Sequence, residues 1–191
     1  MRSPFLKFVL ALVLAPGLRA DIPIVIETEL GRIEAVLDEK QAPITVANLL
    51  KYVDAGHFDK GEFYRTVRTD PDNQPTSAVK IDVIQARANG KGKDAFPPIQ
   101  IERTRETGLK HVNGALSMAR TGPDTAQDEF FICIGDQPEL DFAGKRNPDG
   151  QGFAAFGRVI SGLAVVQQIQ RSPFNGQQLT PPIRILSIRR K

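Results

Sequence analysis

The sequence is poor in the residues that form disulfide frameworks and metal centres. Its 191 residues include one cysteine, two histidines and no tryptophan. One cysteine cannot form an intramolecular disulfide, and with two histidines it cannot supply the ligands of a zinc site. No EF-hand loop is present, so only a calcium site built from carboxylates stays open. We therefore expect no metal and no cofactor, and we expect Cys133, inside the apolar run FFICI, to be an unreactive core residue.

Neither histidine is placed as a catalytic base. His57 lies in the polar bend GHFDKG and His111 lies in LKHVNG, without a serine or cysteine nucleophile in a known motif. An imidazole without a nucleophile performs no hydrolysis. We therefore predict that both histidines are structural.

Residues 1–20 have the pattern of a secretory signal peptide. Basic residues precede an apolar run, Phe8 to Leu14, that is too short to span a membrane stably. We expect cleavage after Ala20 and a mature protein, beginning at Asp21, that is periplasmic or secreted. The alternative is an uncleaved anchor, because Leu18 is larger than the small residue preferred there. No cysteine lies near the junction, so no lipid anchor is expected.

The small excess of positive charge also belongs to this segment. Lysine and arginine number 25 against 22 aspartates and glutamates, and three of the basic residues lie within residues 1–20. The remaining 22 basic and 22 acidic residues balance. Nucleic-acid binding requires a concentrated basic stripe, and the run 189–191 is more typical of a solvated strand end. We expect no nucleic-acid partner.

Residues 21–191 have the composition of one mainly β domain. Hydrophobic residues form 41% of the sequence, which is enough for a core. The 16 glycines and 14 prolines are well spread and indicate many turns. Periodicity predicts a hairpin over 22–28 and 31–38, a helix from Pro43 to near Gly56, a strand over 62–68, a helix capped by Ser161 and ended by Pro173, and a final strand over 183–189.

The strand over 62–68 carries an unusual charged residue. Strict alternation places Arg65 on one face with Phe63 and Val67, and Tyr64 on the other face. A charge among apolar neighbours is costly unless it is paired or functional. Alternatively, this face points outward and Arg65 is a solvated surface residue.

The stretch from Asn113 to Ile134 is the centre of the predicted site. Its sequence, NGALSMARTGPDTAQDEFFICI, indicates two short strands joined by a polar loop. Small residues in the first strand leave space, and the apolar run of the second supplies a wall, as in a small binding pocket. A buried hairpin core is the alternative.

The order of these residues resembles a known signature. LSMA, then GPDT, then EFFIC is similar to the central motif of the cyclophilins, which are peptidyl-prolyl cis-trans isomerases, and the resemblance runs from Ile24 to Ile188. It implies a closed eight-stranded antiparallel barrel capped by two α-helices. It also implies catalysis of rotation about X-Pro bonds, with proline-containing peptides and unfolded exported proteins as partners, by a monomer.

The resemblance implies which residues act. Arg65, in the motif F-Y-R-T-V, takes the place of the catalytic arginine, and Gln85 takes that of the motif glutamine that holds it or the substrate carbonyl. The implied substrate-binding residues are Val83, Ala119, Arg120, Glu129, Phe131, Leu140 and Phe153.

The sequence departs from the family pattern near Gln85. A loop at 69–80 is inserted, Asp82 replaces a phenylalanine, and Ala86 and Arg87 replace two glycines. Glu129 stands in place of a glutamine, which we expect to change peptide preference. These departures leave two hypotheses: an exported prolyl isomerase that assists folding, or a non-catalytic or weakly catalytic proline-peptide-binding or chaperone module on the same fold.

Overall fold

The computed structural model describes residues 21–90 and 95–191. The predicted signal peptide lies outside the described residues. The elements, in chain order, are β1 (Ile22–Thr28), β2 (Gly31–Leu37), α1 (Pro43–Asp54), β3 (Glu62–Val67), β4 (Val83–Arg87), α2 (Thr104–Thr107), β5 (Ala115–Met118), β6 (Glu129–Cys133), the 3-10 turn η1 (Pro138–Leu140), β7 (Ala154–Ser161), α3 (Leu163–Gln170), β8 (Phe174–Asn175) and β9 (Gln178–Arg190).

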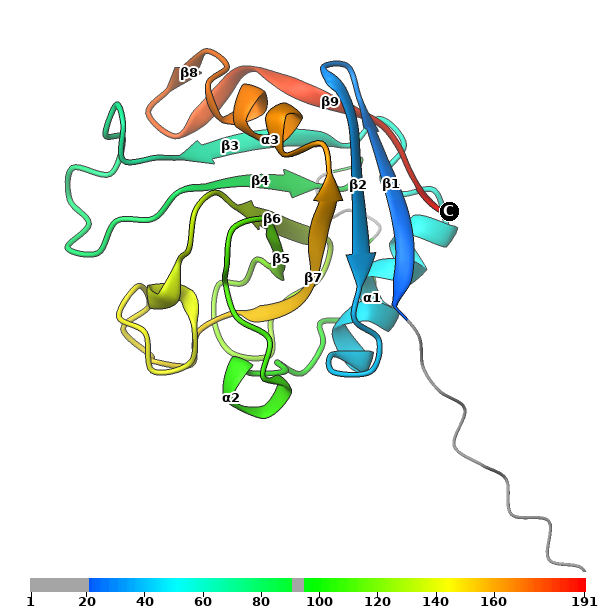
Figure 1. Ribbon diagram of the computed structural model, residues 1–191, viewed down its shortest axis with the longest axis horizontal. Coiled ribbons are helices and arrows are strands. Elements are labelled where there is room, and N and C mark those ends of the chain that lie inside the picture. The colour runs from blue at the N-terminus through cyan, green and yellow to red at the C-terminus, as the bar shows by residue number, and fades with distance from the viewer. Residues whose placement is uncertain (1–20, 91–94) are drawn as a thin grey trace, which may run out of the picture.

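Eight strands close into an antiparallel barrel. They follow one another in the order β1-β2-β7-β5-β6-β4-β3-β9, and pairing of β1 with β9 completes the circle (Figure 1). The two-residue strand β8 pairs only with β9. The predicted eight-stranded antiparallel barrel is therefore confirmed.

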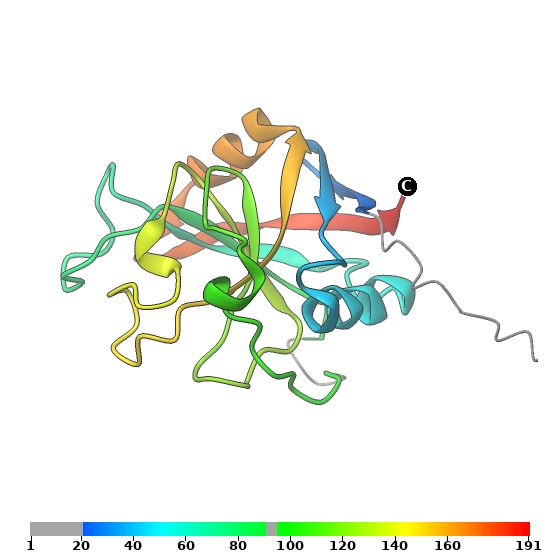
Figure 2. The same ribbon diagram turned by 60° about the horizontal axis from the view of Figure 1, so that its bottom comes forward.

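Helices α1 and α3 are the two predicted caps. Helix α3 packs beside β2, β3 and β4, whereas α1 lies near β7 and β9 (Figures 1 and 2). Pro43 occupies the first turn of α1, where its missing N–H is not needed. The short helix α2 was not predicted, because four residues are too few to show a helical period. No helix in the described part of the chain is long and apolar enough to cross a membrane.

The interior of the barrel is filled by apolar side chains. Alternation along β1 and β2 directs Ile24, Ile26, Ile33 and Leu37 inward, where each is 0 to 1% exposed. Phe63 of β3 and the residues Phe130 and Ile132 of β6 complete this core. Burying each such side chain contributes about 1.5–3 kcal/mol.

A second apolar cluster lies on the outer face of the barrel. It consists of Val67, Ile81, Val83, Ala115, Phe131, Cys133 and Leu140, with Ala119 and Phe153 packed against it. The apolar run of β6 is thus divided: Phe130 and Ile132 point inward, and Phe131 and Cys133 point outward. The outward cluster forms the wall of the site, whereas the inward residues belong to the barrel core. The two alternatives for this stretch, a binding pocket and a buried core, are therefore both present, one on each face of β6.

The structure corrects the predicted alternation of β3. The register passes from Phe63 opposite Ala86 to Arg65 opposite Gln85, so Tyr64 is an extra residue in a β-bulge. Phe63 therefore faces the barrel interior, whereas Arg65 faces the outer cluster. The prediction that Arg65 shares a face with Phe63 was wrong because a bulge breaks the period of two.

The predicted cap of α3 was also wrong. Ser161 is the last residue of β7 and pairs with Glu34 of β2, and the helix is preceded by Gly162 with φ +89°. A side chain at Gly162 would place its Cβ 2.4 Å from the carbonyl oxygen of Arg32. Only glycine tolerates both the conformation and the contact.

Candidate active site

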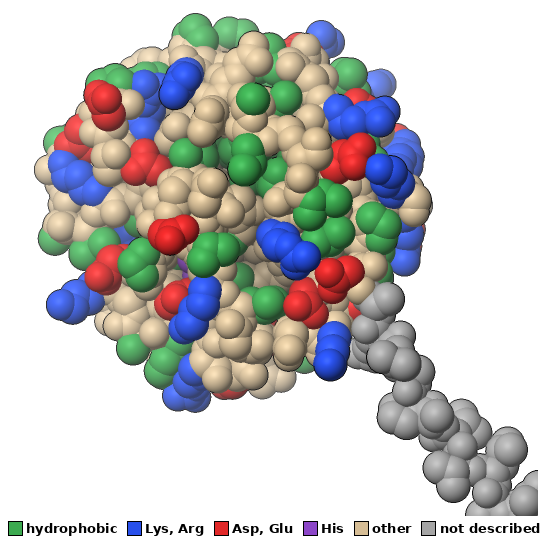
Figure 3. Space-filling view, in the orientation of Figure 1, with side chains coloured by type: hydrophobic (Ala, Val, Ile, Leu, Met, Phe, Trp, Pro, Cys, Tyr) green, Lys and Arg blue, Asp and Glu red, His purple; other side chains and the backbone are tan. Residues whose placement is uncertain are grey.

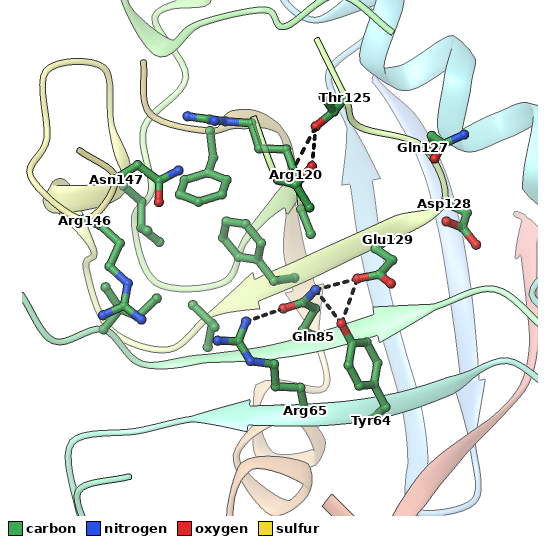
Figure 4. Close-up of a pocket in the computed structure, with 17 residues that line it drawn as sticks. Tyr64, Arg65, Gln85, Arg120, Thr125, Gln127, Asp128, Glu129, Arg146 and Asn147 are labelled. Atoms are coloured by element: carbon green, nitrogen blue, oxygen red, sulfur yellow. Dashed lines mark hydrogen bonds between the residues drawn. The ribbon is translucent and has the colours of Figure 1, made fainter. Parts of the chain in front are cut away.

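A pocket of about 570 Å³ lies over the outer apolar cluster, beside β3, β4 and β6 (Figure 4). All nine residues that the sequence implicated line it: Arg65, Val83, Gln85, Ala119, Arg120, Glu129, Phe131, Leu140 and Phe153. Strand register explains the convergence, because Gln85 lies opposite both Arg65 of β3 and Phe131 of β6. Residues distant in sequence are thus neighbours across two strand pairs.

Arg65 is held by two side-chain amides. Its Nη1 donates to Gln85 Oε1 at 2.7 Å, while Nε and Nη2 donate to Gln177 Oε1 at 3.0 and 2.6 Å. Burial lowers the pKa of Arg65, although Tyr64 and Glu129 oppose the shift. A guanidinium nevertheless stays charged in a protein. Both acceptors are neutral, so they fix the orientation of the guanidinium without cancelling its charge.

Gln85 also belongs to a second network on its other side. Its Nε2 donates to Glu129 Oε2 at 2.6 Å and to the Tyr64 hydroxyl at 2.8 Å, and that hydroxyl donates to Glu129 Oε2 at 2.7 Å (Figure 4). Burial, and then the hydrogen bond to Glu129, raise the pKa of Tyr64. Tyr64 is therefore a neutral donor. The Gln85 carbonyl oxygen therefore faces a donor on Arg65, and its NH₂ group faces acceptor oxygens on Glu129 and Tyr64.

Aromatic rings form the apolar wall. Phe131 and Phe153 meet edge to face, with centroids 5.3 Å apart and an interplanar angle of 89°. His111 stacks behind Phe131 at 6.0 Å. With Leu140 and Val83, these rings make a surface suited to a compact apolar ring.

His111 is part of a buried hydrogen-bonded chain behind this wall. Its Nδ1 lies 2.7 Å from Asp141 Oδ1, and its Nε2 lies 2.9 Å from Ser117 Oγ. Burial by itself would raise the pKa of Asp141, but the hydrogen bonds and the charge of His111 outweigh burial and lower this pKa. The groups are those of a hydrolytic triad, yet Ser117 is fully buried and no substrate can reach it. Both histidines have structural contacts, since His57 stacks on Phe96 at 5.4 Å.

Arg120 contributes its side chain as well as its backbone. The side chain is 2% exposed and forms a bidentate pair with Asp149 at 2.7 and 3.0 Å. It also donates to the carbonyl of Gly152 and lies 5.0 Å from the centroid of the Phe153 ring. Sequence reasoning named Arg120 as substrate-binding but did not predict these side-chain contacts. The side chain ties the loop before β7 to the pocket.

The two ends of the pocket carry opposite charges. Arg146 lies at the same end as Arg65, and burial followed by the Arg65 charge lowers its pKa. Glu129 and Asp128 lie at the other end (Figure 4). A peptide that crosses the pocket therefore passes from a cationic to an anionic region.

Several polar residues that line or support the site were not predicted, among them Tyr64, Asp128, Arg146 and Gln177. Tyr64 was assigned to the opposite face because nothing in the letters EFYRTV marks a bulge. Arg146 and Gln177 reach the site from loops far along the chain, and no sequence period connects them to Arg65.

The departures at Asp82, Ala86 and Arg87 lie away from the pocket, whereas Glu129 lines it. Asp82 points to the inserted loop, where its carboxylate accepts hydrogen bonds from the backbone and hydroxyl of Thr69 at 3.0 and 2.9 Å. Ala86 is fully buried in the barrel core, and Arg87 pairs with Glu62. None of the three substituted residues lines the pocket.

The described residues contain no group of three or more histidine, cysteine, aspartate or glutamate side chains that could hold a metal ion. The polar groups of the pocket are instead guanidinium, amide, hydroxyl and carboxylate groups. Such a set can bind peptide groups and stabilise charge that develops on them.

Comparison with known proteins gives one family. Residues 23–190 match the family model described as cyclophilin type peptidyl-prolyl cis-trans isomerase/CLD. The chain is 32% identical to peptidyl-prolyl cis-trans isomerase A of Dickeya dadantii over 149 residues, which are 78% of this chain and 70% of that protein. It is 36% identical to peptidyl-prolyl cis-trans isomerase cyp18 of Streptomyces antibioticus over 146 residues, which are 76% and 81% of the two chains.

Solved structures agree on the fold. A cyclophilin type peptidyl-prolyl cis-trans isomerase of Cryptosporidium parvum superposes with a TM-score of 0.72 at 22% identity, covering 90% of this chain and 98% of that one. A further crystal structure of that protein, in the presence of the dipeptide Ala-Pro, has a TM-score of 0.69 at 22% identity and covers 88% and 98% of the two chains.

Proposed function

The chain belongs to the cyclophilin-type peptidyl-prolyl cis-trans isomerases, and from this membership we propose that Arg65 and Gln85 carry its catalysis and that exported proteins are its substrates. The protein is an enzyme that rotates X-Pro bonds. The proposal concerns which residues act, on which chains and in which compartment.

The reaction requires no covalent step. An X-Pro bond resists rotation, with a barrier of about 18–20 kcal/mol, because the nitrogen lone pair is shared with the carbonyl. Uncatalysed rotation takes on the order of tens to hundreds of seconds. A catalyst needs only to bind the twisted state, in which the nitrogen regains its lone pair, more tightly than either planar state.

Arg65 has the donors that this state needs, and its fixed orientation is the observation that carries the proposal. Three of the five guanidinium N–H groups point to Gln85 and Gln177. The other two, one on Nη1 and one on Nη2, remain for substrate. We assign to them the prolyl nitrogen as it loses conjugation, with the proline ring against Phe131, Leu140 and Phe153.

The substrate backbone binds beside this ring. The Ala119 N–H is taken by the Glu129 carbonyl at 2.9 Å, whereas the backbone of the next residue, Arg120, has no hydrogen-bond partner among the described residues. An extended peptide therefore has an N–H and a carbonyl to pair with at Arg120. Cyclophilins bind proline-containing peptides, and unfolded exported proteins supply such segments.

A catalytically silent binding module is the weaker candidate. That hypothesis depended on Asp82, Ala86, Arg87 and Glu129 impairing the site. The first three contact the inserted loop, the barrel core and Glu62, whereas Glu129 lines the pocket and accepts a hydrogen bond from Gln85. The pocket keeps both Arg65 and Gln85 in direct contact. A module that only bound peptides would not need an arginine held in this way.

The N-terminal pattern supports a periplasmic location, and the surface supports a monomer. The described residues include only four exposed large apolar side chains, those of Ile44, Val112, Ile160 and Leu186. Figure 3 shows acidic and basic side chains interspersed over the face drawn. These features favour an enzyme that works alone on unfolded chains.

Prolyl isomerisation by the protein from Asp21 to Lys191 tests the catalytic assignment. A preorganised donor at a desolvated centre contributes about 3–4 kcal/mol, so Arg65→Ala should lower kcat/KM by about a hundredfold or more. Arg184→Ala is the matched control, because this arginine is 71% exposed on β9. A folded Arg65→Ala protein with nearly full activity would refute the assignment, and an inactive wild type would favour the binding module.

A further inference from the structure

We propose that Gln177, in the turn between β8 and β9, is a positioning residue that sets the orientation of the catalytic guanidinium. The proposal rests on the catalytic role of Arg65. Gln177 itself does not line the pocket, and it acts on substrate only through Arg65.

The contact between the two side chains is bidentate. Gln177 Oε1 accepts from both Nε and Nη2 of Arg65, at 3.0 and 2.6 Å, and so fixes one edge of the planar guanidinium. Gln85 holds only Nη1. With Gln85 alone, the guanidinium could still turn about that single bond. The two glutamines together determine where the two free N–H groups point.

Gln177 is itself held by two hydrogen bonds and by the backbone conformation of the residue before it. Its backbone carbonyl accepts from Thr66 N at 2.9 Å, which ties the turn to β3. Gly176, before it, has φ +59°, which lets the turn place Gln177 against the strand. Its Nε2 donates to the backbone carbonyl of Asn73 at 3.1 Å.

The bond to Asn73 decides which end of the amide faces Arg65. A backbone carbonyl only accepts, so it selects the NH₂ end of Gln177 and leaves Oε1 for the guanidinium. Asn73 lies in the inserted loop and is anchored to β3 through Arg68 N and Thr66 O, each at 2.9 Å. The inserted loop is therefore a support for the catalytic arginine and is joined to it through Gln177.

The neutrality of Gln177 matters for catalysis. A carboxylate would hold the same edge of Arg65, but its charge would compete with the prolyl nitrogen for the guanidinium. An amide orients the guanidinium and leaves its charge available. The inserted loop thus supports a neutral acceptor at this position.

Kinetics of single and double variants test the proposal. Gln177→Ala and Gln177→Met, the latter matched in length but without an acceptor, should each lower kcat/KM about tenfold with an unchanged Kd for a proline peptide. Gln178→Ala is the control, since Gln178 is exposed and its side chain makes no hydrogen bond within the described residues. In the Arg65→Ala background, Gln177→Ala should cause no further loss of the residual activity.

A nuclear magnetic resonance measurement supplies a readout at the Arg65 guanidinium itself. The Nε–H proton of Arg65 should exchange slowly with water in the wild type and in Gln178→Ala, and about tenfold faster or more in both Gln177 variants. The proposal would be overturned if Gln177→Ala caused the same fold loss of activity in the wild type and in the Arg65→Ala variant. Full activity of the Gln177 variants would also overturn it. If Arg65→Ala itself is fully active, the catalytic assignment fails instead.

Discussion

At the scale of single residues, the carboxylate of Glu129 defines the direction of Gln85. A carboxylate only accepts hydrogen bonds, so it attracts the NH₂ end of Gln85 and turns Oε1 toward Arg65. An uncharged amide at position 129 would be able to face Gln85 with either end. Glu129 therefore fixes the direction of donation in the series of hydrogen bonds that joins Glu129, Gln85 and Arg65.

We predict that Glu129→Gln lowers kcat/KM by about threefold to tenfold, because part of the population would hold Gln85 with its NH₂ group toward Arg65. Tyr64→Phe should cost about twofold or less, since Gln85 keeps its bond to Glu129. Steady-state kinetics of both variants provide the comparison. A larger loss in Tyr64→Phe than in Glu129→Gln would contradict this order.

The sequence could identify the residues of the site but not their mutual orientation. Arg65, Gln85 and the apolar wall were predicted because each lies in a short motif or an apolar run. Tyr64 was missed because a bulge depends on how two strands pair, which a single strand's alternation cannot reveal. Gln177 was missed because its role is set by a turn at the other end of the chain.

At the scale of elements, the loop from Asp141 to Phe153 depends on Arg120. This side chain is almost fully buried and bonds to both Asp149 and the Gly152 carbonyl. The hydrogen bond from Arg120 lowers the pKa of Asp149. The ion pair therefore stabilises the folded protein fully above the unfolded-state pKa of about 4, and its contribution is lost as pH falls through the lower folded-state pKa.

Asp149→Asn should consequently lower Tm at pH 7 by about 2 to 4 °C, and the difference from wild type should shrink as pH falls below about 4. Thermal unfolding between pH 7 and about pH 2.5 measures this. Asp21→Asn is the control, because its pair with Arg158 is exposed and 3.7 Å long. A Tm difference that stays constant across this range would show that the charge of Asp149 is not what holds the loop.

Elements with a regular period were predicted well, and those set by contacts were not. The hairpin of β1 and β2 and the start of α1 follow from alternation and from Pro43. The start of α3 was misplaced because the close approach of Arg32 to Gly162 is a contact between distant segments. The inserted loop at 69–80 is mostly exposed, but its Gln74 is 1% exposed and bonds to Arg68, Ile81 and Arg146, which no local sequence pattern indicates.

At the scale of the whole molecule, the site is external to a solid barrel. The interior is filled by large side chains such as Phe63, Phe130 and Phe156. A proline-containing peptide therefore meets the barrel wall from outside and can be bound at one proline without being threaded through the protein.

We predict that the full chain, produced in a bacterium with two membranes, yields a periplasmic form beginning at Asp21 that sediments as a monomer. Mass spectrometry and analytical ultracentrifugation of the periplasmic fraction measure both properties. Leu18→Ala should speed cleavage, because a small residue is preferred at that position. A full-length product in the membrane fraction would instead identify an uncleaved anchor.

The seam between β1 and β9 also has a consequence for how the protein is made. Ile26 lies opposite Ile188, so the first strand to be synthesised pairs with the last. A chain that emerges gradually from a ribosome cannot close its barrel until β9 has arrived. During that interval β1 has an open edge that can pair with other chains. Until β9 pairs with β1, the unfinished chain is therefore open to edge-to-edge association.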